Sequence, residues 1–338
     1  MAGELAGQGA QLPNPHALIR PFVRREAVLS SKIEGTQATL GELLAAEAGA
    51  TVDRSPDDLR EVGNYVVALE YGVKRLKSLP LSLRLIRELH AKLMNRVRGG
   101  QAAPGEFRRV QNWIGPPGCT QATATYVPPS PGDLIGCLGA LEKSLHTHDL
   151  PVLVHAAMVH YQFEAIHPFL DGNGRVGRLL ITLMLVERRV MPSPLLYLSA
   201  FFEATRQEYY SRLLGVSRDG AWEPWLEYFL NGVARQAEDA PSRVARINQL
   251  LARWRHNIAG KGTKNAMLLI DIVGENPFIT IKGAAKRLDV AFTTAQRAID
   301  SLRRAKIVTE ASETKRDRVF CAKDILQILE EPARLVPG

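Results

Sequence analysis

Residues 167–180, HPFLDGNGRVGRLL, bring together a histidine, a carboxylate, three glycines and two arginines, and then turn apolar. Glycines directly before a helix let backbone N–H groups close around an anion, and the helix N-terminus adds its positive dipole. Arg175 and Arg178 are three residues apart, so both side chains can reach the same anion. Two guanidiniums and a glycine turn suit a polyphosphate better than a carboxylate.

Two further side chains supply what phosphate chemistry needs. Asp171 precedes the glycine turn, and a lone carboxylate beside phosphates is a usual way to hold Mg²⁺. His167 could take the proton from a hydroxyl that attacks phosphorus. Each feature alone also has a structural explanation, namely a helix cap, an ordinary turn and a solvated basic face. Together they predict phosphoryl or nucleotidyl transfer to a hydroxyl, and the Walker A and Rossmann glycine patterns are absent from the sequence.

The stretch HPFLDGNGRVGR resembles the signature of the Fic family, H-x-F-x-[DE]-G-N-G-R-x-x-R, at every fixed position. The resemblance covers roughly residues 15–235, including VQNWIG…YVPPSP and the later PLLYLSAFFE…WLEYFL. It implies a mainly α fold, in which a Fic-type helical core carries a β-hairpin flap. It also implies transfer of AMP from ATP to a Ser, Thr or Tyr hydroxyl of a protein, with release of pyrophosphate.

The resemblance also assigns roles. His167 would be the general base, Phe169 would set the loop by packing, and Asp171 would hold Mg²⁺ on the α- and β-phosphates. The nucleotide-binding residues would be Gly172, Asn173, Gly174, Arg175, Gly177, Arg178, Thr205 and Tyr209. Within this set, residues 172–174 form the anion hole, Arg178 contacts the γ-phosphate, and Thr205 and Tyr209 lie near the adenosine, although many relatives carry Asn at the position of Thr205.

A second stretch, SSKIEG at residues 30–35, resembles the inhibitory motif of the same family, [ST]-x-x-x-E-[GN], with Ser30, Glu34 and Gly35 at its fixed positions. A carboxylate from this stretch, on a nearby helix, could pair with Arg178 bidentately and keep it from the γ-phosphate. The α-phosphate would then be misplaced, and an error of about 1 Å costs on the order of a hundredfold in rate. The alternative is a solvated Glu34 beside an ordinary cap at Ser30. With the Fic signature present, we favour an intramolecular inhibitor.

Apolar residues at three-to-four spacing predict helices over residues 83–94, 133–148, 151–167 and 177–191. β-favouring pieces around PPGCTQ predict a β-hairpin or flap over residues 105–131. A linker is expected at residues 234–244. We therefore expect an N-terminal helical region at 1–100 with the inhibitory motif, a Fic catalytic core at 101–236, and a linker helix with a winged helix-turn-helix domain at 237–338.

The net charge of +8 lies entirely in residues 241–338, which hold 18 Lys and Arg against 10 Asp and Glu. The order of helices and short β pieces there resembles a winged helix-turn-helix, with Thr293 or Thr294 at the start of the recognition helix. Its small core would contain Ala284, Ala285, Leu288, Val290, Ile299 and Leu302. Gln296, Arg297, Arg303 and Arg304 would be exposed, and residues 315–318 would form the tip of the wing. We favour DNA binding slightly over dimerisation or protein contacts.

The overall composition, 46% apolar and 23% charged, is ordinary for a globular protein, and 338 residues suggest two or three domains. No apolar run is long enough for a membrane span, and the first residues lack the features of a signal peptide. We therefore expect a cytoplasmic protein with no membrane partner. Cys119, Cys137 and Cys321 are widely spaced and are expected to be free thiols.

The sequence thus favours a self-inhibited adenylyltransferase with ATP and Mg²⁺, whose partners are a protein hydroxyl, the chain itself in auto-AMPylation, DNA, and a second copy in a homodimer. One alternative is a DNA-binding regulator whose Fic core only senses nucleotide. Another is a Fic enzyme that runs a different transfer, of UMP or phosphocholine, or that removes AMP.

Overall fold

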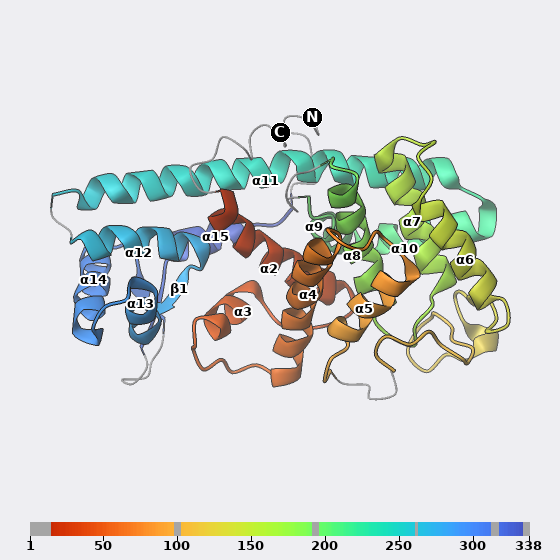
Figure 1. Cartoon of the computed structure of the whole chain (residues 1–338), viewed down its shortest axis with the longest axis horizontal. Helices are drawn as coiled ribbons and strands as arrows, with labels where there is room; N and C mark the ends of the chain where they lie inside the picture. Colours follow the sequence, from red (N-terminus) through yellow and green to blue (C-terminus); the bar gives the residue numbers. More distant parts are fainter. Residues whose placement is uncertain (1–14, 98–102, 191–195, 261–262, 312–317, 334–338) are drawn as a thin grey trace.

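The computed structural model describes residues 15–97, 103–190, 196–260, 263–311 and 318–333. This part of the chain is mainly helical, with one small three-stranded sheet. The helices of the first two thirds are α2 (Pro15–Ile33), α3 (Leu40–Glu47), α4 (Pro56–Arg75), α5 (Leu83–Leu93), α6 (Leu134–Leu145), α7 (Val152–Ile166), α8 (Asn173–Glu187), α9 (Ser199–Ala204) and α10 (Arg206–Asp219). They form a helical body, coloured red to green in Figure 1.

Helix α8 is buried over almost its whole length. Its sequence, NGRVGRLLITLMLVE, is apolar on every side after the first two turns, which is typical of a helix enclosed by others. Helices α7, α4, α5 and α2 pack against it. Gly72 of α4 permits a close approach, because a Cβ there would lie 2.8 Å from a methyl carbon of Leu183. The N-terminus of α8 is therefore held firmly by its neighbours.

The predicted helices are present, with one shift of boundary. Residues 83–94, 133–148 and 151–167 correspond to α5, α6 and α7, whereas α8 begins at Asn173 rather than at residue 177. The glycines of the signature are thus partly inside the helix, where burial outweighs their low helix propensity. Cys119, Cys137 and Cys321 are free, as expected. Among the helices that the structure describes, none combines the length and apolar character of a membrane span.

The flap at residues 105–131 has less β structure than expected. Its arms meet in a single antiparallel bridge, in which Ile114 and Tyr126 exchange backbone hydrogen bonds of 2.9 and 3.0 Å. A short 3₁₀ turn, η1 (Gln121–Thr123), lies between the arms. Prolines at 116, 117, 128, 129 and 131 lack backbone N–H donors, so a longer ladder cannot form.

The prediction of a linker at residues 234–244 is wrong, because helix α11 runs without a break over Trp222–Ile258. Figure 1 shows it along the whole upper edge, spanning both the helical body and the C-terminal elements. Tertiary contacts explain the continuity. Arg243 is buried, and its Nε donates to Asp239 Oδ2 at 2.7 Å while its Nη2 donates to the Pro332 carbonyl at 2.9 Å. The polar residues that suggested a linker instead join α11 to the C-terminal segment.

The remaining elements form what we call the C-terminal module, residues 263–333. It contains α12 (Lys264–Glu275), β1 (Phe278–Thr280), α13 (Ile281–Leu288), α14 (Phe292–Arg304), β2 (Thr309–Glu310), β3 (Val319–Cys321) and α15 (Lys323–Glu330). The sheet order is β1-β3-β2, and both pairings are antiparallel, with Phe278 opposite Cys321 and Thr309 opposite Cys321. The order of elements is the predicted one.

The start of helix α14 differs from the prediction. α14 begins at Phe292 after Ala291, so neither Thr293 nor Thr294 caps it, and no side chain caps this helix. Thr280 instead caps α13, accepting from the Gly283 N–H at 3.0 Å. The predicted core is present: Ala284, Ile299 and Leu302 are buried, and Ala285, Leu288 and Val290 pack against them.

Candidate active site

A cavity of about 730 Å³ lies at the N-terminal end of α8. The flap, α7, α8, α10 and the turn after α2 each contribute to its wall. Its lining combines charged and polar side chains with aromatic and aliphatic ones. The lining residues used below are Glu34, Trp113, Ile114, Glu164, His167, Gly174, Arg178, Tyr209 and Tyr210. A cavity with an apolar wall and a few convergent charges is the usual form of a nucleotide site.

His167 ends α7 in the left-handed conformation, with φ 49°. Its carbonyl oxygen accepts from Arg108 Nε at 3.0 Å, which fixes the backbone there. Nδ1 lies 3.3 Å from the Glu164 carbonyl oxygen, which can only accept. That contact favours the tautomer with the proton on Nδ1 and leaves Nε2 free to accept a proton. Burial lowers the pKa of His167 to about 4, so the ring is neutral at physiological pH.

The loop between His167 and α8 is held by its own side chains. Asn173 accepts from the Phe169 N–H and donates to the Phe169 carbonyl, both at 2.8 Å. The Phe169 ring stacks on His90, with centroids 3.7 Å apart. Gly172 caps α8 at φ 78°, and a Cβ there would lie 2.9 Å from Met94 Sδ. The Asn173 amide is thus occupied by the loop, and an anion would meet the backbone N–H groups.

Arg178 is the best-partnered charge in the cavity. Its Nε donates to Ser30 Oγ at 2.8 Å, and its Nη2 donates to the Ser30 carbonyl at 2.9 Å and to Glu34 Oε1 at 2.5 Å. Burial opposes ionisation of Glu34, but the charge of Arg178 overcomes it and lowers the pKa of that carboxyl. The predicted contact between the two sequence stretches is therefore present, but it is made through Glu34 Oε1 and is not bidentate.

Glycines make room for this contact. Gly174 lies under Glu34, and a Cβ at Gly174 would collide with Glu34 Oε1. Gly35 has φ 100°, so the chain can turn immediately after Glu34 in a conformation that favours glycine. Ser30 is fully buried within α2, where it serves as the partner of Arg178 rather than as a cap.

Three residues that the sequence assigned to the metal or nucleotide site, namely Asp171, Arg175 and Gly177, are not among those that line the cavity. Asp171 is exposed and accepts from the Gly172 N–H at 2.5 Å, outside the lining of the cavity. Arg175 is buried, and its Nη1 lies 3.7 Å from Glu61. Gly177 packs against Glu164, with no room for a Cβ.

The two residues predicted near the adenosine, Thr205 and Tyr209, line different cavities. Tyr209 lines the cavity, and its hydroxyl lies 2.8 Å from His160 Nε2. Thr205 instead lines a second, smaller cavity, and its hydroxyl donates to the Phe201 carbonyl at 2.7 Å. The assignment of Thr205 to the nucleotide site therefore finds no support in the geometry, because its hydroxyl contacts the Phe201 carbonyl and the Tyr228 hydroxyl instead.

Sequence reasoning did not find Glu164 or Glu26. Glu164 lies one turn before His167 and lines the cavity. Glu26 of α2 is buried and accepts from the Ser199 hydroxyl at 2.5 Å and the Tyr65 hydroxyl at 3.1 Å. For Glu164, an acidic residue inside the otherwise largely apolar α7 is the signal that could have found it, whereas Glu26 lies among arginines and has no such signal.

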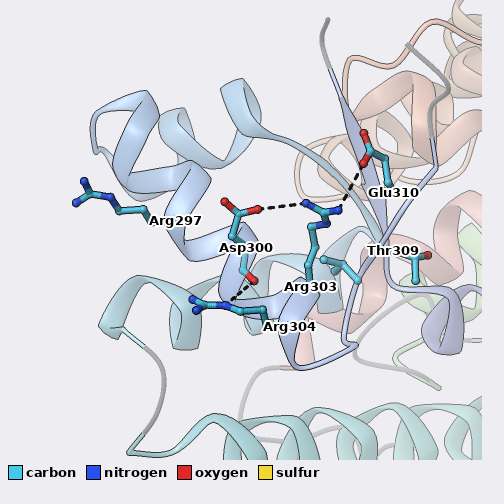
Figure 2. Close-up of a pocket in the computed structure, with 7 residues that line it drawn as sticks. Arg297, Asp300, Arg303, Arg304, Thr309 and Glu310 are labelled. Carbon is cyan, nitrogen blue, oxygen red and sulfur yellow. Dashed lines mark hydrogen bonds and ion pairs between the residues drawn. The ribbon is translucent and has the colours of Figure 1, made fainter. Parts of the chain in front are cut away.

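The C-terminal module carries an open, basic hollow along α14 and β2 (Figure 2). Arg303 lies 3.4 Å from Asp300 and 3.7 Å from Glu310, and Figure 2 shows it between these carboxylates. Arg297 is exposed and also lines the hollow. Within the described residues, Arg304 donates to the Asp300 carbonyl and to the Ser301 hydroxyl, at 3.3 Å each. The predicted wing tip lies outside the described residues, except Arg318.

Comparison with known proteins agrees with this site. The sequence model of the Fic/DOC family N-terminal region matches residues 2–74, and that of the Fic/DOC family matches residues 80–185. Together they cover just over half of the chain and include both Glu34 and the loop from His167 to Arg178. The chain belongs to the Fic/DOC family. Both stretches singled out in the sequence therefore fall within regions characteristic of the family.

Among curated relatives, the protein adenylyltransferase Fic of Drosophila virilis is 31% identical over 202 residues, covering 58% of this chain and 38% of that protein. The corresponding protein of Drosophila grimshawi is 30% identical over the same length and shares of the two chains. This Fic/DOC chain thus spans less than two fifths of the curated relatives it matches.

Solved structures share the fold. A Fic family protein from Desulfovibrio desulfuricans G20 superposes with TM-score 0.62 at 20% identity, covering 95% of this chain and 93% of that one. A Fic domain-containing signalling protein from Bacteroides thetaiotaomicron gives TM-score 0.56 at 21% identity, covering 71% of this chain and 95% of that one. The mainly helical Fic fold is confirmed.

Proposed function

We propose that this Fic/DOC protein is a self-inhibited protein adenylyltransferase, which transfers AMP from ATP to a Ser, Thr or Tyr hydroxyl of a protein. The observation that carries the proposal is the ion pair between Arg178 and Glu34, 2.5 Å long, inside the cavity that also holds His167. A neutral histidine, a helix N-terminus and a buried guanidinium suit a triphosphate and an incoming hydroxyl. The curated relatives carry the name of this activity.

The proposed reaction is a displacement at the α-phosphorus. His167 Nε2 takes the proton of the target hydroxyl, and the hydroxyl oxygen forms the new bond to the α-phosphorus. The bond from that phosphorus to the bridging oxygen breaks, and pyrophosphate leaves with the electron pair. Arg178 would hold the γ-phosphate, and the N-terminal N–H groups of α8 would face the remaining phosphate oxygens.

Magnesium is the metal that this chemistry implies, and the residues present fit it. In the described part of the chain no group of three or more His, Cys, Asp or Glu could hold a metal. Mg²⁺ at nucleotide sites is typically bound through one or two carboxylates plus substrate phosphates, so the exposed Asp171 carboxylate suffices. The ion would neutralise charge on the phosphates and on the leaving pyrophosphate.

Target binding is assigned to the flap. Trp113 and Ile114 line the cavity and are 42% and 38% exposed, so apolar surface faces the incoming segment. The flap itself is anchored, because Asn112 Nδ2 donates to the Phe169 carbonyl at 3.0 Å and Tyr126 donates to the Ala165 carbonyl at 3.0 Å. An extended peptide could add to its edge as a strand and present a hydroxyl to His167. The chain itself is one such target.

Inhibition follows from what Arg178 already binds. With three hydrogen bonds to Ser30 and Glu34, its guanidinium has little capacity left for a γ-phosphate. We assign the resting state to this arrangement, and activity requires that Glu34 leaves. For the C-terminal module, the element order and the exposed Arg297 and Arg304 support a winged helix-turn-helix that contacts DNA phosphates.

The test uses ATP labelled at either end. Purified wild type, E34G and E34G/H167A are incubated with Mg²⁺ and ATP carrying label on the α- or the γ-phosphate. Adenylyl transfer puts α-label, and no γ-label, on E34G, with little on the other two proteins. Label from γ-ATP would indicate phosphorylation, and transfer from UTP or CDP-choline in place of ATP would indicate another Fic reaction. An absence of protein label with every donor would favour the nucleotide-sensing alternative.

A further inference from the structure

Glu164 is a buried carboxyl in the cavity that the reaction described above does not use. It lies on α7, one turn before His167, and lines the same cavity as Arg178 and Glu34. Its Oε1 is enclosed and has no hydrogen-bond partner. That oxygen packs against Gly177, where any Cβ would collide with it. The first two turns of α8 thus have one glycine under each of two carboxyls, Gly174 under Glu34 and Gly177 under Glu164.

Groups from four elements face this carboxyl. They are Arg178 on α8, Glu34 after α2, Tyr209 on α10, and His160 and His167 on its own helix. Burial raises the pKa of Glu164 to about 8, with Glu34 adding to the rise and Arg178 opposing it. The carboxyl is therefore mostly protonated at pH 7. His160 and His167 are neutral there because burial lowers their pKa to about 3 and 4.

A protonated carboxyl at this position can donate a hydrogen bond to a phosphate, which an ionised carboxylate cannot. A triphosphate held by Arg178 would lie near Glu164, because both side chains line this cavity and the charge of Arg178 acts on the Glu164 carboxyl. An ionised carboxylate would repel that polyanion, whereas a neutral acid has an O–H to donate. A buried polar atom without a partner is costly, and such atoms in folded proteins usually mark a function or a missing ligand.

We propose that Glu164 is a nucleotide-binding residue that donates a hydrogen bond, as a neutral carboxylic acid, to a phosphate oxygen held beside Arg178. The proposal rests on the proposed function only in that ATP is the ligand. It adds a second phosphate contact, from α7, to the one that α8 supplies. It also explains Gly177, since this glycine makes room for the carboxyl.

The experiment measures ATP affinity calorimetrically in the E34G background, at pH 7 and pH 9. E164A should weaken ATP binding about tenfold at pH 7, the loss expected for one hydrogen bond to a charged group. E164Q keeps a donor and should bind within about twofold of its parent. The parent should lose affinity as the pH rises from 7 to 9, because burial still raises the pKa of Glu164 when Glu34 is absent and the acid ionises over this range, while E164Q should not. Adenosine, which lacks phosphates, should bind all three proteins alike.

A control variant keeps the outcomes distinct. E223Q removes an exposed carboxylate on α11 and should change neither affinity nor its pH dependence. Equal weakening by E164Q and E164A, or no weakening by E164A, would overturn the proposal. The pH dependence of the parent needs no substitution at Glu164, so it decides even where E164A fails to fold. If E34G binds ATP but transfers no label, the adenylyltransferase assignment fails while the binding series still tests Glu164.

Discussion

The cavity at α8 and the hollow along α14 both display arginines and carboxylates, but the two regions use them differently. In the cavity the Arg178 side chain is 1% exposed and its partner Glu34 is 34% exposed. Along α14, Arg303 is 39% exposed, with Asp300 at 42% and Glu310 at 32%. Water screens the second set strongly and the first set weakly.

Burial therefore decides what an ion pair does. A buried arginine that loses its partner must find another anion, so Arg178 can be exchanged between Glu34 and a phosphate. An exposed pair contributes roughly 0–1 kcal/mol and yields to salt or to DNA phosphates at little cost. We expect switch-like behaviour in the cavity and graded behaviour along α14, and the following predictions test that contrast.

The largest effect is expected for His167→Ala in the E34G background. Loss of a general base should lower the rate of AMP transfer by about 10²–10⁴-fold, while ATP affinity stays within about twofold because the ring acts on the hydroxyl. Above pH 5 the titration of His167, whose pKa is about 4, should leave the parent rate unchanged, and the rate should fall as the pH drops toward that value and the base becomes protonated. Rates come from α-labelled ATP and affinities from calorimetry. Labelling at the parent rate would remove His167 from the mechanism.

Glu34→Gly should have the next largest effect. Freed Arg178 can hold the γ-phosphate and align the α-phosphate, so auto-AMPylation should rise by about a hundredfold over wild type. E34G/R178A should lose most of that gain, since the arginine is the object of inhibition. A solvated Glu34 predicts no change in any of these proteins. Equal labelling of folded wild type and E34G would therefore contradict the switch.

Ser30→Ala tests the same switch and should have a smaller effect than Glu34→Gly. It removes the hydroxyl that accepts from Arg178 Nε but leaves Glu34 in place. Loss of one hydrogen bond to a charged group should raise auto-AMPylation by roughly tenfold, between wild type and E34G. Ser31→Ala is the matched control, because the neighbouring Ser31 hydroxyl is buried without a hydrogen-bond partner. A rise in S31A equal to that in S30A would indicate a general loosening of α2.

The smallest effects are expected along α14. If the C-terminal module binds DNA, log affinity should fall with log salt by about 0.9 for each phosphate contact. Arg304→Ala should reduce that slope by about one contact, and Arg303→Ala by less, since Asp300 and Glu310 compete for this side chain. Arg253→Ala, at an exposed position on α11, is the control. Absence of any DNA binding at low salt would favour the protein-contact interpretation.

The sequence by itself determined the local chemistry of this protein. The glycine turn, His167 and the arginines are adjacent in the chain, so the N-terminus of α8 and its anion-binding character could be predicted from residue types and spacing. The helices with clear apolar periodicity were predicted for the same reason. The pairing of Glu34 with Arg178 was predicted only through the resemblance to a family motif, because the two residues are far apart in the chain.

Tertiary structure decided everything that depends on which surfaces meet. Burial of Arg243 and Asp239 keeps α11 continuous where the composition suggested a linker. Contacts with different helices separate Tyr209 from Thr205, since Tyr209 meets His160 in the cavity whereas Thr205 meets Phe201 and Tyr228 beside another. Glu164 shows the limit most clearly, since its enclosed oxygen is produced by packing against a glycine of another helix. Desolvation and close packing arise between segments, and they set the protonation state of this carboxyl, which no local pattern encodes.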